Sequence, residues 1–178
     1  IIIKGENTRQ LRSTLYDFLA HRALSYFMTD ENDLTKPAYQ FKIDNAAEFA
    51  KAEEFIKASF PTKDTASLQH KALQLFQDLL KFHLADANPD ALIDADLIRL
   101  NFVNQYSVVD NKDKFFEDAL LAVEQNYPNN PAIAQAMYLR GNIYYGRGQQ
   151  FKPFSKTENQ YEIKRAKELC EAAIKKYP

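Results

Sequence analysis

The chain has 178 residues, of which 46% are hydrophobic, and 23 Lys and Arg residues nearly balance 24 Asp and Glu residues. A formal net charge of -1 gives no overall field that would attract nucleic acid or an anionic membrane, so neither is an expected partner. The single cysteine excludes an internal disulfide, and the sequence has no run of about 18 apolar residues that would span a membrane.

We expect one domain over residues 1–178, because this length buries one continuous core and the 4 Gly and 7 Pro form no flexible linker. The chain opens on Ile1-Ile2-Ile3-Lys4 and stops at Tyr177-Pro178, and both ends look cut. We therefore expect a fragment of a larger protein, with any targeting signal outside these residues.

The first part of the chain predicts two helices around an extended loop. Residues 8–27 carry apolar side chains at steps of three and four, which predicts a helix with one apolar face. Residues 36–41 predict a loop or short strand, because the residue before a proline avoids the helical region. A second helix is predicted over residues 46–59, ended by Pro61. The apolar face of the first helix carries Leu11, Leu15, Phe18, Leu19, Arg22 and Tyr26.

The rest of the chain predicts only helices. The helix over residues 67–84 has a wide apolar stripe that includes His83, and Asn88-Pro89 follows it. Because helix follows helix throughout, the predicted fold class is all-α. The remaining predicted helices cover residues 91–106, 112–127, 132–146 and 161–177.

The last two helices carry the clearest repeat signal. In the first of them, Gly141 lets a neighbouring helix approach closely, Tyr144 fills the space one turn later, and Gly148 ends the helix. This pattern resembles the tetratricopeptide family, although Arg140 stands at the usual leucine position and the loop between the helices is longer than the family's turn. In the second helix the family's spacing falls on Ala166, Cys170, Ala173 and Pro178.

The tetratricopeptide resemblance implies stacked antiparallel helical hairpins, which form a right-handed solenoid. The repeat is degenerate, because earlier hairpins match the pattern less well. The alternative is an ordinary helical bundle in which Pro and Gly merely end helices.

The same resemblance indicates a binding site. The family's first-helix positions that face a concave groove fall here on Gln135, Tyr138, Asn142 and Tyr145. Tyrosine rings and amide groups suit the recognition of an extended peptide. The alternative is that the tyrosines pack on the next hairpin.

Three runs of sequence, residues 14–24, 36–41 and 89–97, resemble the N-terminal helical region of large alpha-2-macroglobulin-like proteins, chiefly from Bacteroidetes. The resemblance implies a location in the periplasm, on the outer membrane surface or outside the cell. It also implies protease capture or a related role, with a protein partner: the chain's own downstream β-domains, or another envelope protein or peptide. The thioester and bait regions of that family lie far downstream, so no functional residue carries over.

The sequence shows no catalytic or metal-binding constellation, and we expect no metal and no cofactor. Asp17 and His21 stand one helical turn apart, which is typical of a surface hydrogen bond. His83 is predicted to be a core or boundary histidine and His70 to face solvent. Cys170 fits a small buried position better than a nucleophile's role.

The remaining polar patterns predict surface. Asp94 and Asp96 stand two residues apart on a helix, so they point to different sides and are predicted to be solvated. Residues 141–148 follow no strand, which argues against a phosphate loop despite the glycines. In the last helix, basic and acidic residues interleave as mutually supporting surface charges, namely Lys164, Arg165 and Lys167 with Glu162, Glu168 and Glu171.

These observations leave three functions. The leading one is a non-catalytic protein-interaction or docking domain of an envelope alpha-2-macroglobulin-like protein. The second is a free-standing tetratricopeptide adaptor that binds a peptide. The third is a helical enzyme with an unrecognised site, which requires a deep pocket where His21 or His83 meets a carboxylate and a nucleophile.

Overall fold

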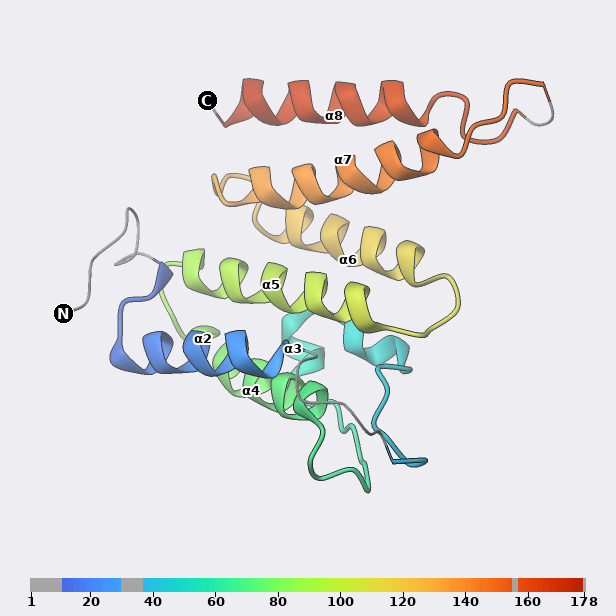
Figure 1. Ribbon diagram of the computed structural model, residues 1–178. Coiled ribbons are helices and arrows are strands. Elements are labelled where there is room, and N and C mark those ends of the chain that lie inside the picture. Colours follow the sequence, from blue (N-terminus) through green and yellow to red (C-terminus); the bar gives the residue numbers. More distant parts are fainter. Residues whose placement is uncertain (1–10, 30–36, 155–156, 178) are drawn as a thin grey trace. The chain divides into compact units, whose positions relative to one another are not determined.

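The computed structural model describes residues 11–29, 37–154 and 157–177 (Figure 1). These residues form seven α-helices and one 3₁₀ helix and contain no strand, which confirms the all-α class. The chain divides into two compact units, residues 1–112 and residues 113–178. Among the described residues, no helix is both long enough and apolar enough to cross a membrane.

The first unit is organised around one central helix. Helix α4 contacts α2, α3 and α5. Its residues Leu73, Phe76 and Leu79 are fully buried, as are Leu24 of α2 and Phe55 of α3. The elements of this unit are α2 (Leu15–Phe27), the 3₁₀ helix η1 (Ala46–Phe49), α3 (Ala52–Phe55), α4 (Leu68–His83) and α5 (Asp90–Tyr106).

Helix α2 begins at Leu15, later than the predicted start at residue 8, because Thr14 caps it. The Thr14 hydroxyl accepts a hydrogen bond from the Asp17 amide at 3.2 Å, and the Asp17 carboxylate accepts one from the Thr14 amide at 2.8 Å. This reciprocal capping box satisfies amides that the first turn leaves free. Residues 8–10 of the predicted helix lie outside the described residues.

The apolar face predicted for the first helix exists, but it points away from the core of the unit. Leu15 is 69% exposed and Leu19 is 55% exposed, and Phe18 and Tyr26 are exposed as well. An amphipathic helix normally turns its apolar side inward. Here the buried side consists of Asp17, Ala20, His21 and Leu24.

The prediction of one helix over residues 46–59 is wrong, because the chain forms two short helices there, η1 and α3. Between them Ala50 and Lys51 have extended backbone, with ψ of 161° and 153°. The Arg99 guanidinium of α5 donates hydrogen bonds to the carbonyls of Glu48 and Ala50 at 2.5 Å and 2.9 Å. Arg99 thereby provides partners for backbone acceptors at the break.

The same arginine explains why Asp96 is buried. Arg99 Nε donates a hydrogen bond to Asp96 Oδ1 at 2.8 Å, and the guanidinium lies 4.3 Å from the centre of the Phe55 ring. Burial raises the pKa of Asp96, and the charge of Arg99 opposes that rise. The predicted solvated position of Asp96 is therefore wrong. Asp94 has a different partner, Arg12, but is likewise only 25% exposed.

The second unit contains α6 (Lys112–Asn126), α7 (Ile133–Gln149) and α8 (Glu162–Lys176), with the first residue of α6 at the boundary between the units. Four helices, α4, α5, α6 and α8, match their predicted ranges to within one residue at each end. Helix α7 continues three residues beyond the predicted end at Gly146.

Helices α7 and α8 pack side by side at short range (Figure 1). A Cβ atom added at Gly141 would lie 3.1 Å from Cys170 Sγ, which confirms the predicted close approach at this glycine. One added at Gly148 would lie 2.4 Å from a side-chain carbon of Ile163 and 2.9 Å from its backbone nitrogen. Gly148 thus lies inside the last turn of α7, where it makes room for α8.

Candidate functional site

The four residues predicted to bind a peptide share one exposed face of α7. Gln135, Tyr138, Asn142 and Tyr145 follow one another at steps of three, four and three, and each tyrosine is 53% exposed. The opposite face of α7 is buried and includes Tyr144. The alternative, that these tyrosines pack on the next hairpin, stays a prediction.

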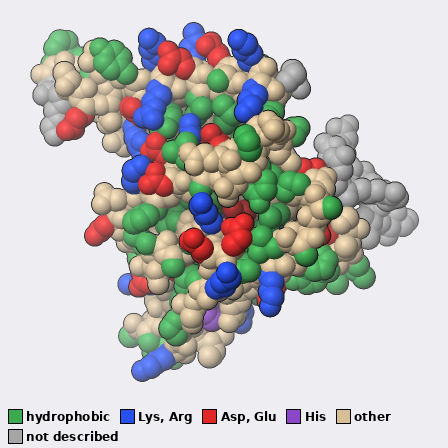
Figure 2. All heavy atoms as spheres, turned by 180° about the vertical axis from the view of Figure 1, so that it is seen from behind, with side chains coloured by type: hydrophobic (Ala, Val, Ile, Leu, Met, Phe, Trp, Pro, Cys, Tyr) green, Lys and Arg blue, Asp and Glu red, His purple; other side chains and the backbone are tan. Residues whose placement is uncertain are grey.

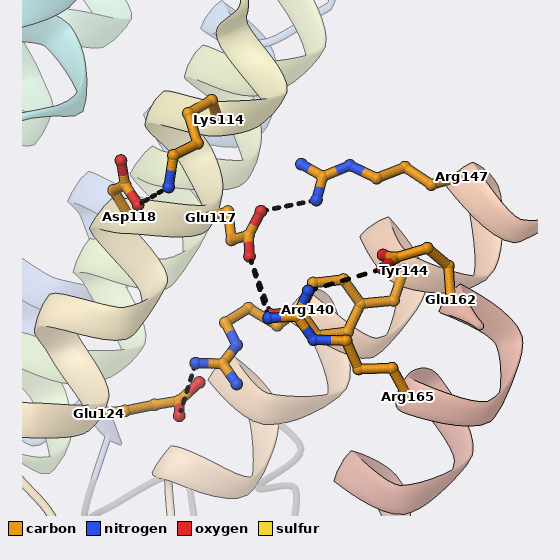
Figure 3. Close-up of polar contacts among 9 residues, drawn as sticks. All are labelled: Lys114, Glu117, Asp118, Glu124, Arg140, Tyr144, Arg147, Glu162 and Arg165. Carbon is orange, nitrogen blue, oxygen red and sulfur yellow. Dashed lines mark hydrogen bonds and ion pairs between the residues drawn. The ribbon is translucent and has the colours of Figure 1, made fainter. Parts of the chain in front are cut away.

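Beneath that face lies a polar network that joins α6, α7 and α8 (Figure 3). Glu117 of α6 accepts a hydrogen bond from the Tyr144 hydroxyl at 2.8 Å and another from Arg147 at 2.7 Å. The Arg165 guanidinium of α8 lies 4.0 Å from the centre of the Tyr144 ring. Tyr144 therefore contacts one charged residue from each neighbouring helix.

The pKa values of Glu117 and Tyr144 reflect the hydrogen bonds of this network. Burial by itself would raise the pKa of Glu117, but the hydrogen bonds from Arg147 and Tyr144 outweigh it and hold that pKa below its usual value. Burial and the bond to Glu117 raise the pKa of Tyr144. Near the other end of α6, Arg140 lies 3.2 Å from Glu124, so an ion pair occupies the position where the tetratricopeptide family has a leucine.

The surface of α8 agrees with its predicted charge pattern. Lys164 lies 3.6 Å from Glu168, and Lys167 lies 3.6 Å from Glu171. In Figure 2 basic and acidic side chains alternate along α8, at the top of the view. Such exposed pairs contribute little to stability.

In the first unit, His83 lies between two carboxylates. Its Nε2 atom is 2.9 Å from Asp17 Oδ1, and its Nδ1 atom is hydrogen-bonded to Asp86 Oδ2 at 2.7 Å. The Asp17 contact is close but lacks the alignment of a hydrogen bond. His83 is 1% exposed, which confirms the predicted core histidine. Each ring nitrogen of His83 thus has a carboxylate oxygen within 2.9 Å.

Two other histidine predictions need correction. Asp17 is completely buried, so it does not form the predicted surface pair with His21. His21 is also buried, and burial, with a smaller effect from the charge of Arg12, lowers its pKa to about 4. His70 does not face solvent: its ring is half-buried, and Nε2 lies 2.9 Å from the Phe60 carbonyl oxygen.

No group of three or more His, Cys, Asp and Glu side chains within residues 11–29, 37–154 and 157–177 is arranged to hold a metal ion. Cys170 is a half-buried free thiol on α8, against Gly141.

The feature that sequence reasoning missed is an apolar surface on the first unit. We call it the α2 surface, and it extends onto α4 because the rings of Tyr16 and Phe82 lie 4.9 Å apart. All its members are exposed. The signal was present as the three- and four-residue spacing of the apolar residues, but that spacing does not tell which way the face points. Its members are Leu15, Tyr16, Phe18, Leu19 and Tyr26 of α2 and Phe82 of α4.

Comparisons with protein-family models, with curated proteins and with solved structures found no match for this chain.

Proposed function

We propose that this chain is a non-catalytic docking domain of an envelope alpha-2-macroglobulin-like protein, and that the α2 surface holds its protein partner. The observation that supports docking is the exposure of six large apolar side chains on adjoining parts of one surface. Single exposed apolar residues are ordinary, but a contiguous group on a soluble domain marks an interaction site.

The composition of the α2 surface fits a protein partner. Tyr and Phe are enriched where proteins meet, and exposed Leu gains about 1.5–3 kcal/mol when it becomes fully buried. The only formal charge on the outward side of α2 between Leu15 and Tyr26 is Arg22. A partner with an apolar face and one acidic residue at its edge would complement this surface.

The resemblance identifies the partner that we propose. In the alpha-2-macroglobulin-like family a helical segment of this kind precedes macroglobulin β-domains, so the β-domains of the same polypeptide are the proposed occupant. That arrangement also implies an envelope or secreted location.

The docking test uses those β-domains as a separately expressed protein. We expect the chain to bind them and the double variant Leu15→Gln, Leu19→Gln to lose at least about tenfold in affinity, as measured by calorimetry. The matched control is Ile174→Gln, which removes an equally exposed aliphatic side chain from α8. Equal binding by wild type and the double variant would reject the α2 surface, and a gene without β-domains would reject the family assignment.

The exposed face of α7 supports a second candidate, a tetratricopeptide adaptor for an extended peptide. The close α7–α8 packing at Gly141 is the contact expected in a hairpin of a degenerate right-handed solenoid. For this candidate, Tyr138→Ala combined with Asn142→Ala abolishes capture of a peptide ligand without unfolding the chain. Unchanged capture by this variant would reject the α7 face as the binding site.

A further inference from the structure

A pocket of about 270 Å³ lies between α2 and α5 in the first unit, and it opens to solvent. Its polar lining comes from Arg12, His21, Arg22 and Ser25, and its apolar lining from Phe18, Leu24, Met28 and Ile98. The volume is just below that of pockets that hold drug-sized ligands, so it suits a smaller molecule or the end of a chain.

Two guanidinium groups in this pocket have N–H donors available to a ligand. Arg12 has its nearest carboxylate oxygen, on Asp94, 3.8 Å away, which is too long for a hydrogen bond. The Arg22 side chain is exposed and makes no ion pair or hydrogen bond with another described residue. No acidic residue is among the described residues that line the pocket.

The other two polar residues add no charge at neutral pH. His21 is neutral there, because its pKa is lowered to about 4 chiefly by burial. The Ser25 hydroxyl donates to the His21 carbonyl at 2.8 Å, which leaves its oxygen as an acceptor. The formal charge of the described lining at neutral pH therefore comes from the two arginines.

The combination of charge and apolar wall defines the ligand class. Arginine pairs with planar anions through two parallel hydrogen bonds, which suits a carboxylate or a phosphate. Asp94, whose half-buried carboxylate lies 3.8 Å from Arg12, repels a doubly charged phosphate more strongly than a carboxylate. Four apolar side chains line the rest of the pocket, so the ligand's remaining atoms are apolar.

We propose that this pocket binds a carboxylate that carries a small apolar group, with Arg12 and Arg22 holding the carboxylate and the apolar wall enclosing the remainder. Two sources present this chemistry: a free carboxylic acid, and the C-terminal carboxylate of a peptide that ends in an apolar residue. The inference does not rest on the proposed docking function, although the pocket shares Phe18 and Arg22 with the outward side of α2.

The test is a titration of the isotope-labelled chain followed by amide chemical shifts. The probes are 3-phenylpropionate, its neutral amide, a short peptide with a free C-terminal phenylalanine, and the same peptide amidated. We expect saturable shifts at Arg22, Ser25 and Ile98 with at least one carboxylate probe and with neither amide. Tighter binding of the free acid identifies a small-molecule site, and tighter binding of the peptide identifies a chain-end site.

Variants distinguish recognition of the ligand's charge from nonspecific binding. Arg22→Gln should weaken the acid at least about tenfold, as expected when a charge-assisted hydrogen bond is lost, and Arg22→Lys should fall between it and wild type. Lys81→Gln, which removes an exposed charge from α4, should bind as wild type does. Leu15→Gln with Leu19→Gln should also leave acid binding unchanged, which distinguishes this site from the docking surface.

Three results would overturn the proposal. They are equal binding of acid and amide, equal binding by wild type and Arg22→Gln, and no saturable shift with any probe up to about 10 mM, where even weak specific binding is detectable.

Discussion

Asp17 of α2 and His83 of α4 face each other in the core of the first unit, with 2.9 Å between Oδ1 and Nε2 and both side chains almost fully buried. The same aspartate closes the capping box of α2 through Thr14. Because this contact directs the polar side of α2 toward α4, the apolar side of the helix faces outward. The proposed docking surface is thus a consequence of how α2 is held.

Removal of the Asp17 carboxylate should lower the free energy of unfolding. Asp17→Ala loses the capping box and leaves the His83 ring without one of its two carboxylates, so we expect the free energy of unfolding to fall by about 2–4 kcal/mol. Urea denaturation measures this change. Asp78→Ala, at an exposed position of α4, is the control and should change the free energy by less than about 0.5 kcal/mol. An equal effect of the two variants would contradict the buried role of Asp17.

The glycines of α7 give a graded test of helix packing. At Gly146 nothing lies within 4 Å of an added Cβ, so Gly146→Ala should stabilise the chain by about 0.5–1 kcal/mol through helix propensity. At Gly148 the added Cβ meets the backbone of Ile163, so Gly148→Ala should cost about 1–3 kcal/mol. Gly141→Ala should fall between them, because the sulfur of Cys170 can shift. Thermal unfolding measures the order, and a stabilising Gly148→Ala would show that α8 does not approach there.

Loss of the buried Glu117 carboxylate should destabilise the chain far more than loss of the exposed Asp118 carboxylate next to it. Glu117→Ala leaves half-buried Arg147 and buried Tyr144 without their acceptor, so we expect a loss of about 2–4 kcal/mol. Tyr144→Phe removes only one hydrogen bond and should cost about 1–2 kcal/mol. The next residue of α6 supplies the control: Asp118 forms an exposed pair with Lys114, and Asp118→Ala should cost less than about 1 kcal/mol. If Asp118→Ala costs as much as Glu117→Ala, the buried network is not what holds these helices.

Glu48 gives the stability of the chain a pH dependence. Burial raises its pKa from 4.5 to about 7 in the folded chain, the Asn45 amide opposes that rise, and Asp44 adds to it. The unfolded chain therefore loses this proton first, and the free energy of unfolding falls by about 3 kcal/mol between pH 4.5 and pH 7. Glu48→Gln keeps an acceptor for the Asn45 amide but has no proton to lose.

The measurement is the stability of wild type and Glu48→Gln at pH 5 and pH 8. The variant should gain about 3 kcal/mol relative to wild type at the higher pH. His21 acts in the opposite direction: its pKa is lowered to about 4 from 6.5, so its contribution is present above pH 6.5 and is lost as the pH falls toward 4. Comparison of the two chains at each pH removes the His21 contribution, and a pH-independent difference would contradict a shifted Glu48.

Much of the fold could be predicted because helix spacing is local. Ser67 and the apolar steps after it fix α4, and Gly141 with Tyr144 identified the α7–α8 contact. The break at residues 50–51 could not be predicted, because its cause is Arg99, which lies 49 residues away from Ala50 along the chain. The sequence signal was weak: a single arginine in an apolar stretch, three residues after Asp96.

In the candidate sites, too, local features could be predicted and features that depend on distant residues could not. The exposed positions of Tyr138 and Tyr145 agree with the groove positions that the tetratricopeptide resemblance implies. The α2 surface did not follow from sequence, because periodicity distinguishes the two sides of a helix without telling which is buried. That choice depends on His83, 66 residues beyond Asp17. The pocket beside Arg22 likewise depends on Ile98 of another helix.

The outward direction of the apolar side of α2 is tested most directly by unfolding free energies of three single variants. Leu15→Gln and Leu19→Gln should each change the free energy by less than about 0.5 kcal/mol, because these side chains are already in solvent. Leu24→Ala, on the buried side of the same helix, should cost about 2–5 kcal/mol. If Leu19→Gln destabilises the chain as much as Leu24→Ala, the apolar side of α2 is part of the core and the docking surface does not exist.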